Sequence, residues 1–293
     1  MNFAMALTGT CEYASAIDHF RNANVLAEKG GDHELVADCH ISLARVFNDT
    51  SDYESALRSA KCALDVVTHL DSHMFGTQTR LAACYGCIGN VYNSVGQMQA
   101  GLQFHRRALS ACRKCGDKRG ECLALINVGY SCSYLGDLEE AERAFEEGMD
   151  VARQIGDKHS EGTALGDLSS VYGHREDFER AVALADASIA LLRESGDAHA
   201  EGTTWSTKGS IYVKMEDYRN AIDSFAAALQ LAEQCGHREG IAKRNVNLGS
   251  AYLQSGHKVV AAQYFRKAII LLKELYGSNH DWVKMVEANL SKC

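Results

Sequence analysis

The chain has 293 residues, of which 46% are hydrophobic and 23% charged, so it has enough apolar residues for a sizeable core and does not resemble a disordered chain. Its formal net charge of −8 argues against a globally basic nucleic-acid binder. Proline is absent, whereas about fifteen would be expected at an average usage of ~5%, which favours uninterrupted helices over loop-rich β architectures.

The chain shows no feature of a membrane or secreted protein. No run approaches the roughly 18 apolar residues of a membrane span, so we expect no membrane insertion. The first residues, MNFAMALTGTCEY, lack the basic segment of a secretory signal. The eleven cysteines are odd in number and form no small-domain disulfide framework. We therefore expect free thiols and a cytoplasmic location.

A period of forty residues organises the sequence. The pair Gly-Asp recurs at 116–117, 156–157 and 196–197, and the series continues with Gly236. Gly76 lies forty residues before Gly116, and Gly31 lies a further 45 residues before Gly76. Columns of small and large residues keep the same register, namely Ala44, Gly89, Gly129, Ser169, Gly209 and Gly249, then Phe47, Tyr92, Cys132, Tyr172, Tyr212 and Tyr252, and then Ala60, His105, Phe145, Ala185, Phe225 and Phe265.

Each unit is predicted to form two antiparallel helices of roughly 16–18 residues, because its apolar residues are spaced by three and four. Aspartates are placed to cap the second helices, at Asp52, Asp137, Asp177 and Asp217. The boundary glycines suit a left-handed residue at a helix C-terminus. The prediction is a half repeat at 1–30, six repeats at 31–75, 76–115, 116–155, 156–195, 196–235 and 236–276, and a C-terminal capping helix at 279–291.

These columns resemble the tetratricopeptide repeat (TPR) family, whose pattern is a bulky residue, Leu-Gly, Tyr, Ala, Phe and Ala. The fifth and sixth repeats carry it well, with Trp205, Gly209, Tyr212, Ala221, Phe225 and Ala228, and with Leu248, Gly249, Tyr252, Ala261, Phe265 and Ala268. The resemblance implies an all-α fold, a right-handed TPR superhelix forming a single solenoid over 1–293. The forty-residue period resembles the long-helix subclass of the spindle-orientation scaffold Pins/LGN.

The sequence departs from the repeat pattern in three places. Lys208 occupies a column that otherwise holds aliphatic residues such as Leu168 and Leu248, and Cys132 stands where an aromatic residue is usual. At the start, Phe3, Ala4 and Leu7 match the end of a first helix, so the chain is predicted to begin inside a repeat. This register raises the hypothesis that the chain is a fragment or short isoform of a longer repeat protein.

No catalytic signature is present. The sequence lacks GxxxxGK followed by Ser or Thr, GxGxxG, GxSxG and HExxH, so we expect no enzyme activity and no cofactor. Two CxxC pairs occur, Cys84/Cys87 and Cys112/Cys115. Their helical spacing splays the thiols, so we interpret them as packing residues and expect no metal, with a zinc site or redox switch as the alternative.

The resemblance places a partner-binding groove on the first helices of the repeats. The residues predicted to face it are Arg45, Asn48, Asn90, Asn93, Asn127, Tyr130, Ser170, Ser210, Asn247 and Ser250. Asparagine can pair with both the N–H and the C=O of a peptide backbone, so this row predicts a protein or peptide ligand, with a solvated polar face as the alternative. A chaperone-type carboxylate clamp is not expected, because Gly86, Thr163 and Asp167 stand at its basic positions.

Charge is distributed unevenly along the chain. Residues 237–293 carry nine Lys/Arg and four Asp/Glu, a net charge of +5, which leaves −13 for the rest. The acidic group is Asp137, Glu139, Glu140, Glu142, Glu146, Glu147 and Asp150, and the basic group is Lys243, Arg244, Lys258, Arg266, Lys267 and Lys273. These groups are either solvated faces or docking patches, including patches for head-to-tail self-association.

The leading functional prediction is a non-catalytic protein–protein interaction adaptor or scaffold that binds a partner peptide in the groove. The first alternative is a structural subunit of a cytoskeletal or axonemal assembly. The second alternative is a peptide-sensing regulator.

Overall fold

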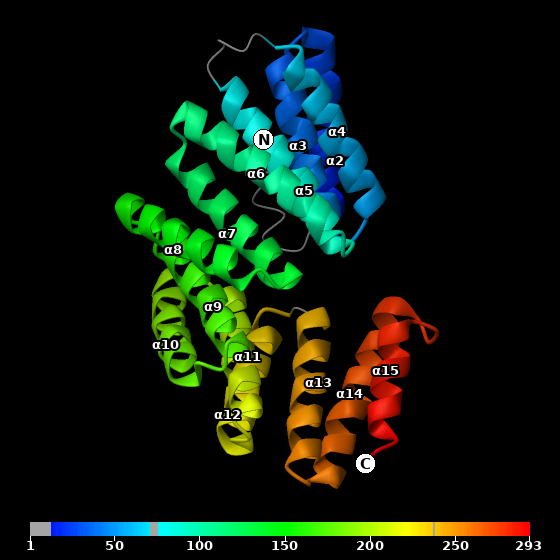
Figure 1. The fold of residues 1–293 in the computed structure, drawn as a ribbon. Coiled ribbons are helices and arrows are strands. Elements are labelled where there is room, and N and C mark those ends of the chain that lie inside the picture. The colour runs from blue at the N-terminus through cyan, green and yellow to red at the C-terminus, as the bar shows by residue number, and fades with distance from the viewer. Residues whose placement is uncertain (1–12, 71–75, 237) are drawn as a thin grey trace. The chain divides into compact units, whose positions relative to one another are not determined.

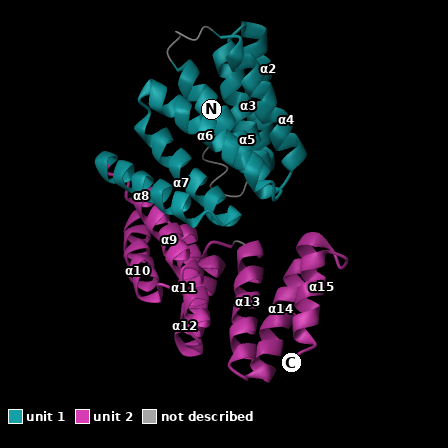
Figure 2. Ribbon diagram, viewed as in Figure 1, with its two compact units in different colours: residues 1–155 teal, residues 156–293 magenta. Residues whose placement is uncertain are grey.

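The structure is a computed structural model that describes residues 13–70, 76–236 and 238–293. These ranges contain fourteen α-helices and no strand, which confirms the predicted all-α fold of antiparallel helix pairs (Figure 1). Phe3, Ala4 and Leu7, predicted to end a first helix, lie outside the described residues, as does His237. The helices form two compact units, residues 1–155 and 156–293 (Figure 2).

The described residues of unit 1 form one helix and three helix pairs. Its elements are α2 (Tyr13–Gly30), α3 (His33–Asp49), α4 (Tyr53–Thr68), α5 (Thr77–Ser94), α6 (Met98–Cys115), α7 (Lys118–Leu135) and α8 (Leu138–Ile155). Unit 2 consists of three pairs and a final helix. Its elements are α9 (Lys158–His174), α10 (Phe178–Ser195), α11 (Ala198–Lys214), α12 (Tyr218–Gln234), α13 (Arg238–Gln254), α14 (Lys258–Tyr276) and α15 (Asp281–Leu290).

The forty-residue period of the sequence is the period of the helices. The first helices α7, α9, α11 and α13 begin at residues 118, 158, 198 and 238, and the second helices α8, α10, α12 and α14 begin at 138, 178, 218 and 258. The four predicted aspartate caps are confirmed, since Asp52, Asp137, Asp177 and Asp217 each accept a hydrogen bond from the backbone N–H three residues later. The boundary glycines have positive φ, as at Gly116 (72°) and Gly196 (76°), so the predicted left-handed caps are confirmed as well.

The small residues of the first helices allow the second helices to pack closely. A Cβ built on Gly129 would lie 2.7 Å from the Phe145 ring, and one on Gly209 would lie 2.7 Å from the Phe225 ring. In the second repeat the ring is an imidazole, because His105 lies 2.6 Å from the Cβ position of Gly89. The rings of Phe145, Phe225 and His105 are buried. Where a ring faces this column, glycine is therefore required by close approach rather than by backbone conformation.

The final helix covers the apolar face of α14. Val283 and Val286 of α15 are fully buried and form one core cluster with Phe265, Ile269 and Leu272 of α14. His280 caps α15 by accepting a hydrogen bond from the Trp282 N–H at its Nδ1. Within the described ranges, no helix is both long and apolar enough to cross a membrane.

Candidate functional site: two polar grooves

Unit 1 contains a groove of about 720 Å³ formed by α3, α5, α6 and α7, which we call the unit 1 groove. Its polar lining includes Arg45 of α3, Asn90 of α5 and Asn127 of α7. Much of the remaining lining is small, namely Ala82, Ala83, Gly86, Ala108, Gly120 and Ala124. A Cβ on Gly86 would meet nothing within 4 Å, so this part of the groove is open. This lining suits a peptide ligand whose apolar side chain contacts the small residues and whose polar backbone pairs with the polar residues.

The cysteines of the two CxxC pairs differ in exposure. Cys84, Cys87 and Cys112 are buried, whereas Cys115 is exposed. Burial raises the pKa of the Cys84 and Cys112 thiols to about 12, so both are protonated and weak nucleophiles at neutral pH. Among the described residues, no group of three or more His, Cys, Asp or Glu side chains is arranged to hold a metal ion. The packing role of these cysteines stays a prediction that metal analysis of the purified protein tests.

Unit 2 contains a second groove, of about 450 Å³, between α11 and α13, which we call the unit 2 groove. Hydroxyl groups line its α11 side, and they donate within the helix to the carbonyl four residues earlier. The donors are Thr203 at 3.1 Å, Ser206 at 3.1 Å, Thr207 at 3.3 Å and Ser210 at 3.0 Å. Because the hydroxyl protons are used in this way, the oxygens are left to accept hydrogen bonds from a ligand.

The α13 side of the unit 2 groove carries two basic residues, Lys243 and Arg244, and one carboxylate, Glu239. Lys243 is exposed, and Asn247 is half-buried. Arg244 is only 7% exposed, and its Nη2 donates to Thr203 Oγ1 at 3.3 Å. Its Nε is buried without a hydrogen-bond partner. Burial lowers the pKa of Arg244, although the carboxylate of Glu239 acts in the opposite direction. The guanidinium is therefore desolvated and incompletely bonded.

The structure brings five of the ten predicted groove residues into these grooves. Arg45, Asn90 and Asn127 line the unit 1 groove, and Ser210 and Asn247 line the unit 2 groove.

The other five lie elsewhere. Asn48 accepts a hydrogen bond from Ser94 Oγ at 3.1 Å, and Asn93 contacts His105 Nε2 at 3.2 Å and Ser131 Oγ at 3.0 Å. Asn93 therefore links α5 to α6 and α7. The remaining three, Tyr130, Ser170 and Ser250, are not among the residues that line either groove.

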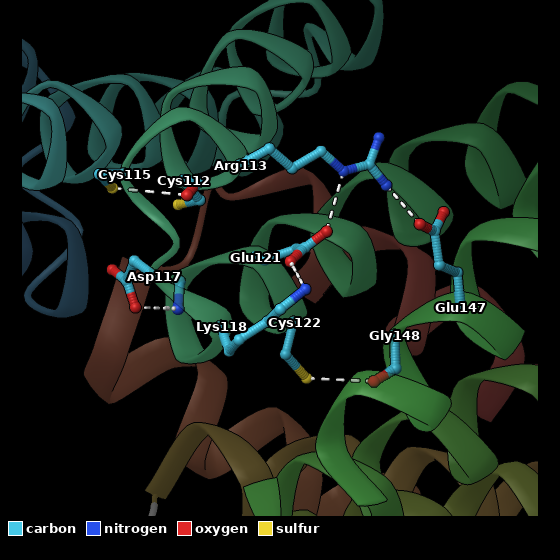
Figure 3. Close-up of polar contacts among 10 residues, drawn as sticks. Cys112, Arg113, Cys115, Asp117, Lys118, Glu121, Cys122, Glu147 and Gly148 are labelled. Atoms are coloured by element: carbon cyan, nitrogen blue, oxygen red, sulfur yellow. Dashed lines mark hydrogen bonds and ion pairs between the residues drawn. The ribbon is translucent and has the colours of Figure 1, made fainter. Parts of the chain in front are cut away.

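An ion-pair network around one buried carboxylate, Glu121, lies beside the cysteine pair at the junction of α6, α7 and α8 (Figure 3). Glu121, 6% exposed, accepts from Arg113 Nε at 2.9 Å and Lys118 Nζ at 2.8 Å, and Arg113 also pairs with Glu147. Burial raises the pKa of Glu121, but Lys118 and Arg113 outweigh it, and the net shift is downward. In unit 2, Arg193 pairs with Glu201 in the same way, at 2.6 Å.

This recurring pair was not predicted from the sequence. Its signal in the sequence is an arginine eight residues before a glutamate, at 113 and 121, at 153 and 161, and at 193 and 201. The network also bears on the acidic group of α8, since Glu147 pairs with Arg113, and Glu140 accepts two hydrogen bonds from Arg106. Part of the acidic group of α8 is therefore neutralised within unit 1.

Helix pairs in register, with small and ring columns at their interfaces and grooves along their first helices, define a helical-repeat protein. The tetratricopeptide repeat family matches residues 80–154, 121–194 and 201–274, together more than half of the chain. The chain belongs to the tetratricopeptide repeat family. A search of curated proteins found no match.

Solved structures share this fold. A Rap protein complexed with Competence and Sporulation Factor superposes with a TM-score of 0.73 at 20% identity, covering 93% of this chain and 73% of that one. Aspartyl phosphate phosphatase F from Bacillus subtilis gives 0.73 at 14% identity, with 94% and 69% covered. BtubC (BKLC) from P. vanneervenii gives 0.61 at 18% identity, with 78% and 92% covered. At these identities the likeness concerns the fold alone.

Proposed function

We propose that this protein is a non-catalytic adaptor that binds a peptide segment of another protein in its first-helix grooves. The observation that carries the proposal is the lining of the two grooves, in which asparagine and hydroxyl side chains face open space from successive first helices. Asparagine amides and hydroxyl oxygens are the groups that pair with an extended backbone. A similar scaffold, the Rap protein, was crystallised with a separate factor, which supports a binding role for this fold.

Within the family, we place the chain in the long-helix subclass typified by the Pins/LGN scaffold. The support is the forty-residue period, which is longer than the thirty-four of ordinary tetratricopeptide repeats. The eleven cysteines favour a reducing, cytoplasmic location. The proposed subclass favours an association with the cytoskeleton. A structural subunit of a cytoskeletal assembly is the competing function, and it predicts contacts on several faces rather than in the grooves.

A random dodecapeptide library displayed on phage tests the groove proposal. We expect the wild-type protein to enrich related peptides, and the double variant Arg45→Glu with Asn90→Ala to lose that part of the enrichment that depends on the unit 1 groove. The matched control is Arg58→Glu, which reverses an exposed charge on α4 outside both grooves. Circular-dichroism melts should be nearly unchanged in both variants. Equal enrichment by wild type and double variant would move the site out of the unit 1 groove.

The same variants separate the adaptor from the structural subunit. Capture from cell lysate followed by quantitative mass spectrometry should show a few proteins that the double variant loses and the Arg58→Glu control retains. Peptides from those proteins should then bind the purified chain in isolation. A set of partners that the double variant captures as well as the wild type would favour the structural subunit.

A further inference from the structure

The repeat pattern does not explain Arg244. The residues forty positions apart in its column are Cys84, Ala124, Ala164 and Thr204, all buried and all smaller than arginine. The fold therefore needs only a small packing side chain at this place in a first helix. An arginine here adds a positive charge that the packing of α13 does not require.

The protein leaves this charge without the partner that it provides for other buried charges. Glu121 and Glu201 are each bonded by arginines of the preceding helix. Within the described residues, no carboxylate lies within ion-pair distance of Arg244, whose only hydrogen bond is the 3.3 Å contact to Thr203. A buried guanidinium that lacks a carboxylate is strongly destabilising, because its desolvation is not compensated. A site of this kind is stabilised when a ligand brings the missing anion.

The surrounding groups fit an anion on a passing chain. Exposed Lys243 adds a second positive charge at the same groove, so the two basic residues outnumber the one lining carboxylate, Glu239. Asn247 lies one turn further along α13. The α11 side runs from His199 to Ser210, roughly 16 Å at 1.5 Å per residue, and Arg244 contacts it near the middle, at Thr203. A peptide backbone lying in the groove would therefore continue on both sides of Arg244.

We propose that Arg244 is the recognition residue for a glutamate side chain of a peptide bound in the unit 2 groove. The glutamate carboxylate accepts hydrogen bonds from the guanidinium where it lines the groove, and Lys243 adds long-range attraction. A long acidic side chain fits because the guanidinium is buried below the groove surface while the backbone stays above it. This inference rests on the proposed peptide-binding function and names the chemistry of its ligand.

The direct test is titration of the full chain, observed at the arginine Nε–Hε resonances by NMR. The probe is the capped peptide acetyl-Gly-Ser-Glu-Ser-Gly-amide, and its partner has Gln in place of Glu. We expect a saturable shift of the Arg244 resonance with the Glu peptide and binding at least ~10-fold weaker with the Gln peptide. The resonance is assigned by its loss in Arg244→Gln, and Lys243→Gln should weaken binding several-fold. Arg266→Gln, an exposed change on α14 outside the groove, is the control.

A second measurement separates ligand recognition from a structural role. Without ligand, Arg244→Met should melt at the same temperature as wild type or higher, because it removes an uncompensated buried charge. A melting temperature several degrees lower would show that Arg244 serves the fold and would overturn the proposal.

Three further NMR results would also overturn the proposal. These are no shift at Arg244, a shift with inorganic phosphate but not with the Glu peptide, and a shift that requires a free peptide C-terminus.

These outcomes are distinct from those of the library selection. If the wild-type protein enriches peptides that the double variant loses, but Arg244 does not respond to the Glu peptide, this proposal fails and the adaptor function stands. If Arg244 responds to the Glu peptide but the library yields no enrichment, the anion subsite is supported and the adaptor function is contradicted.

Discussion

At the scale of single residues, two glycines one turn apart on α5 have opposite roles. Gly89 faces His105 at 2.6 Å from its Cβ position, whereas Gly86 faces open space. Gly89→Ala should lower the free energy of unfolding by about 1–3 kcal/mol, since the added methyl group overpacks a filled interface. Gly86→Ala should raise it by about 0.5–1 kcal/mol, because alanine is the better helix former. Urea denaturation of both variants checks the pair, and equal effects would contradict the packing account.

His105 gives unit 1 a pH dependence of known sign. Burial lowers its pKa to about 4, below the usual 6.5, so the folded state binds the proton less well than the unfolded state. The stability that neutral His105 contributes is fully present above pH 6.5 and is lost as the pH falls from 6.5 to 4. The loss in the free energy of unfolding is about 2 kcal/mol at pH 5.

Replacing this histidine should remove the effect. Three of the equivalent residues are Phe145, Phe225 and Phe265, each packed over a glycine, so a phenyl ring fits the same place. The loss of stability between pH 7 and pH 5 should be smaller in His105→Phe by about 2 kcal/mol, as measured by urea denaturation at both pH values. His69→Gln, a change of an exposed histidine, should behave as wild type. The same pH slope in His105→Phe and wild type would contradict the assignment.

At the scale of elements, α10 and α11 are joined by a charge pair where the sequence shows an irregular column. Lys208 is 9% exposed, and its Nζ lies 2.5 Å from Asp186 Oδ1 and 5.2 Å from the Trp205 ring centroid. Asp186→Ala should destabilise the protein by at least ~1 kcal/mol more than Lys208→Met, because it strands a buried cation whereas Lys208→Met leaves a carboxylate that water can reach. Thermal melts of both variants and the double variant decide this, and the reverse order would contradict it.

The final helix α15 is expected to stabilise unit 2 by covering α14. Val283→Asp places a charge among the fully buried residues of this interface and should cost about 2–4 kcal/mol. Met285→Asp, a change of an exposed residue of the same helix, should cost less than 1 kcal/mol. Hydrogen exchange should rise in α13 and α14 only in Val283→Asp. Unchanged protection there would show that α15 does not cover the repeat.

At the scale of the whole molecule, a change in one repeat should alter the stability of its neighbouring repeats most, because each helix packs against its sequence neighbours within its unit. Gly89→Ala should therefore increase hydrogen exchange most in α5 and in α3, α4, α6 and α7, which pack against it, while α13 and α14 keep wild-type protection. Exchange followed by mass spectrometry of peptides measures the profile. A uniform increase over all helices would show instead that the chain unfolds as one cooperative block.

Much of this fold is readable from local patterns because a repeat protein is built from short-range interactions. The forty-residue period predicted where the helices begin, and aspartate and glycine predicted their ends, since caps depend on three or four neighbouring residues. The ion pairs of Glu121 and Glu201 were overlooked, although their eight-residue spacing recurs, because a charged residue on a helix is solvated unless a neighbouring helix covers it.

The sequence by itself determined the helices, the repeat register and the small and ring columns, because period and capping are local properties of the chain. Only the tertiary structure decided which polar residues of one helical face reach a groove. Asn90 lines the unit 1 groove, while Asn93, one turn later, is bonded to His105 and Ser131. Arg244 is likewise one of several basic residues in the sequence, and only the packing of α13 against neighbouring helices buries it. The physical reason is that burial depends on side chains contributed by other helices, which no pattern within a single helix records.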